Sequence, residues 1–302
     1  MTAPHHDPQF INPQNSTVAP ADAPRFDAAA LAAFSAAYPN DNAQFTHHLV
    51  DHPLLTLDAL AILGESLAPS SIEYNKSDIP VDALPDDAPS NGLGIGDTIR
   101  SIAANQSWAV LKNIEAIPAY RDLLTGLLAE LEAVVTPRTG PMFTLQGYIF
   151  VSSPNSMTPY HFDPEHNILL QLQGSKVMTA YPAGDIRFAP QVEHERYHAG
   201  GHRGLPWDES FSGQGYEAHL VPGSAVLMPI MAPHFVTVGP EPSISLSITW
   251  RSEWSYRESE AHAANRWLRA RGFSPAMPPR WPAHAAARTF AWRVARKLGL
   301  VS

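Results

Sequence analysis

The stretch that decides the fold runs from Thr158 to Pro182, TPYHFDPEHNILLQLQGSKVMTAYP. Two short β-rich segments lie in it, NILLQLQ (167–173) and KVMTAY (176–181), and only Gly174 and Ser175 separate them. Such runs, bounded by turn-forming residues, are typical of paired strands. The centre of the chain therefore predicts antiparallel β-structure.

More segments of the same kind lie on both sides of this stretch. They occupy residues 142–151, 158–162, 217–221, 224–229 and 244–250, and Pro, Gly, Asn and Ser separate them. Seven short strands with polar turns predict an antiparallel sandwich or barrel.

The flanking parts have helical patterns. Asp27 is a plausible N-cap for an alanine-rich helix that Pro39 closes. Helices are also expected over 54–67 and 96–113 and, as a strongly amphipathic one, after Pro118. The sequence thus predicts a mobile arm (1–25), a helical part that packs on the core (26–140), the core itself (141–252) and a helical C-terminal segment (253–302).

Charge separates the C-terminal segment from the rest. Residues 251–302 carry ten Lys and Arg against three Asp and Glu, although the whole chain has a formal net charge of −9. The helix that AAARTFAWRVARKLGL predicts would place Phe290, Val294 and Leu298 along one face. This face could pack on its own domain, form a homodimer, or meet a membrane surface or nucleic acid.

Composition excludes several classes of protein. The chain has no cysteine among its 302 residues, so disulfides, thiolate nucleophiles and cysteine zinc sites are ruled out. No apolar run reaches the roughly 18 residues of a membrane span, and the start shows no secretion-signal pattern. An acidic chain is also a poor general nucleic-acid binder. A soluble, cytoplasmic globular protein is expected.

One motif carries candidate chemistry. His161 and Asp163 are two positions apart on a predicted strand, so both side chains point to the same side. His234, after a second strand and a proline-bounded turn, is a candidate third ligand. Two histidines and one carboxylate on one side of iron leave positions open for small molecules. The alternative is ordinary surface or core histidines, because the chain has 14 of them.

The surrounding pattern resembles a known family. The stretch 158–182 is similar to the metal-binding region of JmjC and cupin-like oxygenases that depend on iron(II) and 2-oxoglutarate, particularly the branch of the asparaginyl hydroxylase that inhibits hypoxia-inducible factor. The positions that match are Thr158, His161, Asp163, Asn167, Gly174 and Lys176. Downstream, Gly223, Pro229 and His234 match the second cupin motif. The resemblance covers residues 142–252 and implies a double-stranded β-helix, or jelly roll.

The resemblance also implies roles for single residues. His161, Asp163 and His234 would bind Fe(II), and Lys176 would bind the distal carboxylate of 2-oxoglutarate. Thr158 and Asn167 match the family's co-substrate or metal surroundings, and Thr249 stands near a further co-substrate position of the family. Lys176, Thr158 and Asn167 also have plain structural readings: a solvent-facing strand lysine, a β-branched strand residue and a turn-forming asparagine. The family branch carries asparagine where Thr249 stands, and simple cupins often carry glycine where Met231 stands.

The implied activity is hydroxylation of an unactivated C–H bond, with O2 consumed and succinate and CO2 as co-products. The expected substrate is a protein or peptide side chain. The alternatives are the same chemistry on a small molecule or a modified nucleic acid component, and a non-catalytic cupin-like metal-binding protein. The insertion 185–215, rich in His, Gly and Arg, would be a lid, a substrate wall or simply a polar loop.

Overall fold

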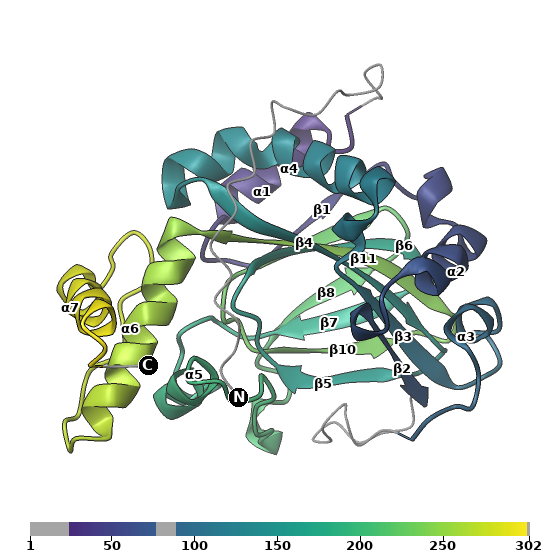
Figure 1. The fold of residues 1–302 in the computed structure, drawn as a ribbon. Helices are drawn as coiled ribbons and strands as arrows, with labels where there is room; N and C mark the ends of the chain where they lie inside the picture. Colours follow the sequence, from purple (N-terminus) through teal and green to yellow (C-terminus); the bar gives the residue numbers. More distant parts are fainter. Residues whose placement is uncertain (1–23, 77–88, 301–302) are drawn as a thin grey trace.

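Two antiparallel sheets form the centre of the molecule in a computed structural model, which describes residues 24–76 and 89–300 (Figure 1). The expected mobile arm lies outside the described residues, apart from its last two positions. The strands are β1 (Ala43–Thr46), β2 (Ile72–Lys76), β3 (Ser107–Lys112), β4 (Met142–Ser152), β5 (Met157–His161), β6 (His166–Gln173), β7 (Lys176–Ala180), β8 (Tyr216–Leu220), β9 (Ser224–Met228), β10 (His234–Val238) and β11 (Ser243–Ser252). The α-helices are α1 (Ala28–Ala37), α2 (Leu57–Ser66), α3 (Ile95–Arg100), α4 (Pro118–Thr139), α5 (Gln191–Tyr197), α6 (Glu253–Arg269) and α7 (Ala286–Lys297).

The strand order identifies the architecture. The larger sheet runs β1-β9-β6-β11-β4-β3-β2 and the smaller runs β5-β10-β7-β8. From β4 to β11 the chain therefore crosses between the sheets at every connection except β7 to β8. Eight strands wound in this way form a jelly roll, the double-stranded β-helix. The predicted fold is confirmed.

The larger sheet has an apolar outer face and a polar inner face. Ile149, Ile168 and Ile248 are fully buried in one cluster with residues of α1, α2 and α4, the helices that cover this sheet (Figure 1). The alternate residues Ser245 and Ser247 of β11 are also buried, but on the opposite face, toward the smaller sheet. The inside of the barrel is therefore partly polar, and a polar ligand can find partners there.

Four strands differ from the sequence-based expectation. Residues 107–112 were expected to be helical but form β3, because their alternately buried side chains pair with β2 and β4. The part expected to be helical contains β1 and β2 as well, so it both covers the larger sheet and extends it. The segment 234–238 was not expected to be a strand, yet it forms β10 in the middle of the smaller sheet.

The start of α1 agrees with its local signal. The Asp27 carboxylate accepts a hydrogen bond from the Ala30 amide at 2.7 Å, as an N-cap should.

Among the described residues, no helix is both long and apolar enough to cross a membrane.

A buried cluster of three histidines joins the insertion to the C-terminal segment. His194 and His198, from α5 and its C-terminal end, stack on His262 of α6, with ring centroids 4.9 and 5.3 Å apart. Both ring nitrogens of His262 are buried without a hydrogen-bond partner among the described residues. Burial lowers the pKa of His194 to about 4 and that of His198 to about 3, and it lowers the pKa of His262 far below the usual value. These rings are therefore neutral in the folded protein.

We expect this cluster to make the protein sensitive to acid. Below about pH 6.5 these histidines bind protons in the unfolded chain, whereas the buried rings of the folded protein stay neutral. The stabilisation that the cluster contributes above pH 6.5 is therefore lost as the pH falls toward the pKa values of the folded protein. Each such histidine lowers the free energy of unfolding by about 1.4 kcal/mol per pH unit over this range. Urea unfolding at pH 7 and pH 5 should therefore show a smaller loss of stability in His262→Phe than in the wild type. His219→Phe, at an exposed position, is the control and should keep the wild-type loss; an equal loss in His262→Phe would contradict the expectation.

Candidate metal centre

The three predicted ligands meet at one end of the smaller sheet. Strands β5 and β10 pair so that His161 lies opposite His234, with ring centroids 4.2 Å apart. Asp163 follows β5 directly, and its Oδ2 lies 3.8 Å from the Nε2 of each histidine. Among the described residues, this is the one group of three or more His, Asp or Glu whose ligand atoms lie within 4.8 Å of one another.

Backbone carbonyls fix both imidazoles for metal binding. The Nδ1–H of His161 donates to the Pro159 carbonyl at 2.7 Å, and that of His234 donates to the Ala232 carbonyl at 2.9 Å. In this tautomer each Nε2 carries a lone pair that points to the centre. Burial lowers the pKa of His161 to about 3 and also lowers that of His234, so both rings remain neutral.

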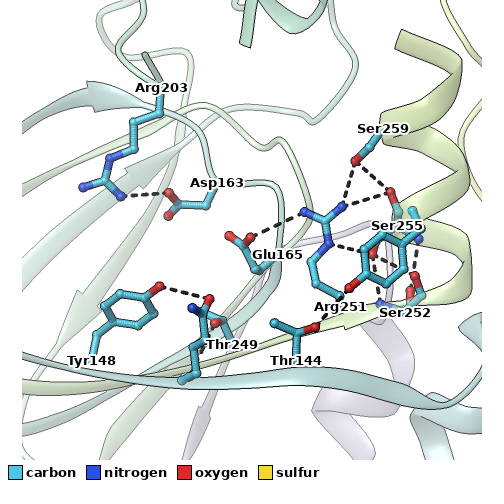
Figure 2. Close-up of polar contacts among 12 residues, drawn as sticks. Thr144, Tyr148, Asp163, Glu165, Arg203, Thr249, Arg251, Ser252, Ser255 and Ser259 are labelled. Carbon is cyan, nitrogen blue, oxygen red and sulfur yellow. Dashed lines mark hydrogen bonds and ion pairs between the residues drawn. The ribbon is translucent and has the colours of Figure 1, made fainter. Parts of the chain in front are cut away.

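Arg203 holds the carboxylate of the group. Its Nη1 donates to Asp163 Oδ1 at 3.0 Å, which leaves Oδ2 for the histidine side (Figure 2). Burial alone would raise the pKa of Asp163, but the charge of Arg203 and its hydrogen bond lower it to about 2. Asp163 is therefore ionised and oriented.

The insertion delivers Arg203 through backbone pairing. Its returning segment runs along the free edge of β5: the Leu205 amide donates to the Tyr160 carbonyl at 2.9 Å, and the Phe162 amide donates to the Arg203 carbonyl at 3.3 Å. The insertion is thus part of the site rather than a detached polar loop. Spacing could not predict this contact, because 40 positions separate Arg203 from Asp163, although the insertion visibly contains arginines.

Met231 supports the same aspartate from the other side. Its amide donates to the Asp163 carbonyl at 2.7 Å, while its backbone has a left-handed φ of 57°. A left-handed conformation costs little for glycine and more for methionine. The geometry therefore explains why glycine suits this position in simple cupins.

Lys176 enters the space between the sheets. Its side chain is buried, and its Nζ lies 5.8 Å from the centre of the Phe150 ring. Among the described residues its ammonium makes no ion pair or hydrogen bond, and burial lowers its pKa to about 7. An unpaired buried cation is costly unless a ligand supplies the opposite charge.

The other residues predicted to contact the co-substrate differ in whether their side chains already have hydrogen-bond partners in the protein. Thr158 lies on β5 opposite Val236, and its hydroxyl makes no hydrogen bond to another described residue. Asn167 accepts a hydrogen bond from the Ser247 hydroxyl at 2.7 Å. Thr249 is buried and donates to the Gln146 carbonyl at 3.4 Å (Figure 2). Thr158 is therefore free to contact a ligand, whereas Asn167 and Thr249 already have protein partners.

Arg251 is less suited than Lys176 to anchor a carboxylate. Its guanidinium contacts Glu165 at 3.4 Å and Ser259 at 2.8 Å, and it stacks on Tyr256 (Figure 2). Its charge and its donors are therefore already engaged within the protein.

The donor set fits a divalent transition metal. Two neutral imidazole nitrogens and one ionised carboxylate oxygen, all on one side, form the ligand set used by non-haem Fe(II) enzymes. These ligands lie at β5 and β10 of a jelly roll, so their location in the fold agrees with the chemistry of the donor set. The chain has a cupin-like fold.

Comparisons with known proteins give only distant similarities to this cupin-like chain. No family model matches the sequence, and no curated protein matches it. The ribosomal oxygenase YcfD from Escherichia coli is 14% identical, with a TM-score of 0.45 over 88% of this chain. The structure of YcfD in complex with cobalt and 2-oxoglutarate has 15% sequence identity and a TM-score of 0.46. A cupin superfamily protein from Desulfitobacterium hafniense has 16% identity and a TM-score of 0.23. The chain spans 65% of the YcfD chain, so the strand order, not these values, carries the fold assignment.

The closer resemblance to the asparaginyl hydroxylase branch stays a prediction, as do the metal-binding and co-substrate roles of the residues named above. The structure shows that the three ligands lie together and that Lys176 shares the inner space of the barrel.

Loss of Arg203 should weaken metal binding without unfolding the protein. Arg203→Gln removes the charge that orients Asp163, and loss of such a partner typically costs about 10- to 100-fold in metal affinity. Titration with Co(II), followed by visible absorption, measures the change. Arg187→Gln is the matched control, because Arg187 lies in the same insertion, is exposed and pairs with Asp185 instead. An unchanged Co(II) affinity in Arg203→Gln would show that Asp163 needs no such support.

Proposed function

We propose that this chain is an Fe(II)- and 2-oxoglutarate-dependent oxygenase that hydroxylates an unactivated C–H bond. The observation that carries the proposal is the shared inner space of the barrel, which holds both the His161–Asp163–His234 group and the unpaired, buried ammonium of Lys176. A metal at the first site and a cation at the second would together bind a dicarboxylic oxoacid at both ends.

The register of the smaller sheet supports binding of the oxoacid by the metal at one end and by Lys176 at the other. Ala180 lies opposite His234, and Lys176 begins the same strand four positions earlier. At about 3.3 Å per residue, the two backbone positions are about 13 Å apart. The long lysine side chain and an extended dicarboxylate are together of the length needed to bridge such a span.

With O2 as the oxidant, the bound iron and oxoacid would supply oxidative decarboxylation to succinate and CO2 and the oxidising power for hydroxylation. The chain's own residues would position that chemistry. His161 and His234 offer Nε2, Arg203 fixes Asp163, and Lys176 neutralises the distal carboxylate. The apolar residues of both sheets, among them Leu169, keep water from the inner space.

We further propose that the substrate is a protein or peptide side chain. The larger sheet continues past β4 into β3 and β2, whereas the smaller sheet ends at β5 (Figure 1). Half-buried side chains of this extension, such as Val110, give an extended chain more surface than a metabolite would use. Turnover of peptides compared with that of small metabolites tests the substrate class, and turnover of metabolites alone would favour the alternative.

Anaerobic addition of Fe(II) and then 2-oxoglutarate tests the activity proposal directly. Chelation of Fe(II) by the keto acid should produce a visible charge-transfer band that neither component shows alone. Asp163→Ala should abolish the band, because it removes an ionised ligand. Iron binding without the band would reduce the protein to a cupin-like metal binder, and stoichiometric Fe(II) binding by Asp163→Ala would refute the ligand assignment.

Lys176 should make co-substrate binding depend on pH. Burial lowers its pKa to about 7 in the free protein, and a bound carboxylate would stabilise the protonated form, so binding above pH 7 takes up a proton. Affinity for 2-oxoglutarate should therefore fall as pH rises from 7 to 9. Calorimetry in buffers of different ionisation enthalpy, with Zn(II) in place of iron, measures this uptake.

Lys176→Met should lose both the affinity and its pH dependence while Zn(II) affinity is retained. Lys112→Met, at a half-exposed lysine of β3 that pairs with Glu73, is the control. Wild-type affinity in Lys176→Met would assign the carboxylate to another residue.

We also propose a homodimer through the C-terminal helices. Phe290, Val294 and Leu298 lie on one side of α7 and are 70%, 41% and 67% exposed. Such an apolar stripe is costly in water unless a partner covers it. Sedimentation should give a dimer for the wild type and a monomer for a variant with serine at these three positions. A monomeric wild type would overturn the proposal.

A further inference from the structure

A second unpaired donor lies near Lys176. Trp108 is on β3, and its indole Nε1–H is buried without a hydrogen-bond partner among the described residues. A buried donor without a partner is costly and therefore rare. Like the ammonium of Lys176, this N–H is available to a ligand.

Strand register places Trp108 beside the ring that Lys176 approaches. On β3 and β4, Trp108 lies opposite Ser152, and Val110 lies opposite Phe150. Trp108 and Phe150 are thus diagonal neighbours on one face of the sheet, within reach of an aromatic side chain. Lys176 approaches the same Phe150 ring from the smaller sheet, at 5.8 Å.

Hydrogen bonds made by the connection that leads from one sheet to the other place both residues at the same end of the barrel. The Ser153 amide donates to the carbonyl of Ser107, the residue before Trp108, at 2.9 Å. Three residues on, the Ser156 carbonyl accepts from the Val238 amide at 2.9 Å, and Val238 lies opposite Lys176. A short segment after β4 therefore links the position of Trp108 to the start of β7.

We propose that the Trp108 indole N–H is the second donor to the distal carboxylate of the oxoacid, next to the Lys176 ammonium. This inference rests on the proposed function. One carboxylate oxygen would take the charged donor and the other the neutral one. An oxoacid without a distal carboxylate would leave both donors unpaired, so Trp108 would help to select dicarboxylic over monocarboxylic oxoacids.

Trp108→Phe tests this role because it removes the N–H and keeps an aromatic ring. With the Zn(II)-loaded protein, calorimetry should show 2-oxoglutarate binding weakened about tenfold or more, since a hydrogen bond to a charged group is lost. Zn(II) affinity should not change. Binding of pyruvate, which lacks the distal carboxylate, should be equal in variant and wild type.

Trp250→Phe is the matched control. Trp250 is a fully buried tryptophan on the outer face of the larger sheet, where it stacks on His166 and Tyr38. This variant should bind 2-oxoglutarate as the wild type does.

A spectroscopic readout on the unaltered protein covers the case in which Trp108→Phe does not fold. In the Zn(II)-loaded wild type, the indole N–H proton resonance of Trp108 should move downfield on addition of 2-oxoglutarate but not of pyruvate. An unmoved resonance would overturn the inference.

The outcomes separate this inference from the proposed function. If the wild type binds 2-oxoglutarate and Trp108→Phe binds it equally well, the role of Trp108 is wrong and the oxygenase proposal stands. If the variant loses 2-oxoglutarate and pyruvate binding alike, Trp108 acts only through the shape of the site, which also contradicts the inference. If the wild type does not bind 2-oxoglutarate at all, the proposed function itself fails.

Discussion

The antiparallel pairing of β5 with β10 is the constraint on which the rest of the site depends. It places His161 opposite His234 although 72 positions lie between them, and Asp163 follows two positions after His161. Since side chains alternate along a strand, a slip of one residue would turn one histidine to the other face of the sheet. The register is fixed in turn by β7, which pairs with β10 along all five of its residues. The candidate metal centre is thus a product of sheet register rather than of a flexible loop.

Much of this arrangement could be predicted from local patterns. The alternation in NILLQLQ and KVMTAY and the tight turn between them indicated two paired strands, and His161 and Asp163 could be placed on one side from spacing alone. The signals fail where tertiary contacts decide the structure. Residues 107–112 form a strand because β2 and β4 lie on either side of them, and nothing local opposes a helix there. The strand HFVTV was missed because His234 was assigned to the end of a turn, although its β-branched and aromatic residues are typical of strands.

The Arg203 contact and the proposed Trp108 contact come from distant segments and could not be found by spacing. Arg203 reaches Asp163 from an insertion whose length and composition indicate only a polar excursion. Trp108 comes from a segment expected to be helical, so its indole could not be placed in the barrel. In both cases the decisive information is which strand edge or sheet face the residue joins. In the described part of the chain, unpaired buried nitrogens also occur outside the barrel, at Trp250 and His262, so the position of Trp108 on the inner face, together with its missing partner, marks it as a ligand contact.

The path of residues 203–205 along the free edge of β5 has a consequence for association between molecules. An exposed edge strand offers unpaired amides and carbonyls to any other chain and promotes aggregation. Here the Leu205 amide and the Arg203 carbonyl occupy that edge, while the side chain of Arg203 turns to Asp163. One short segment thus both covers the edge of β5 and contributes Arg203 to the candidate metal centre. A chimaera that received a shorter insertion from another barrel would therefore lose solubility and metal affinity together, and the two properties can be expected to change jointly as this fold diverges.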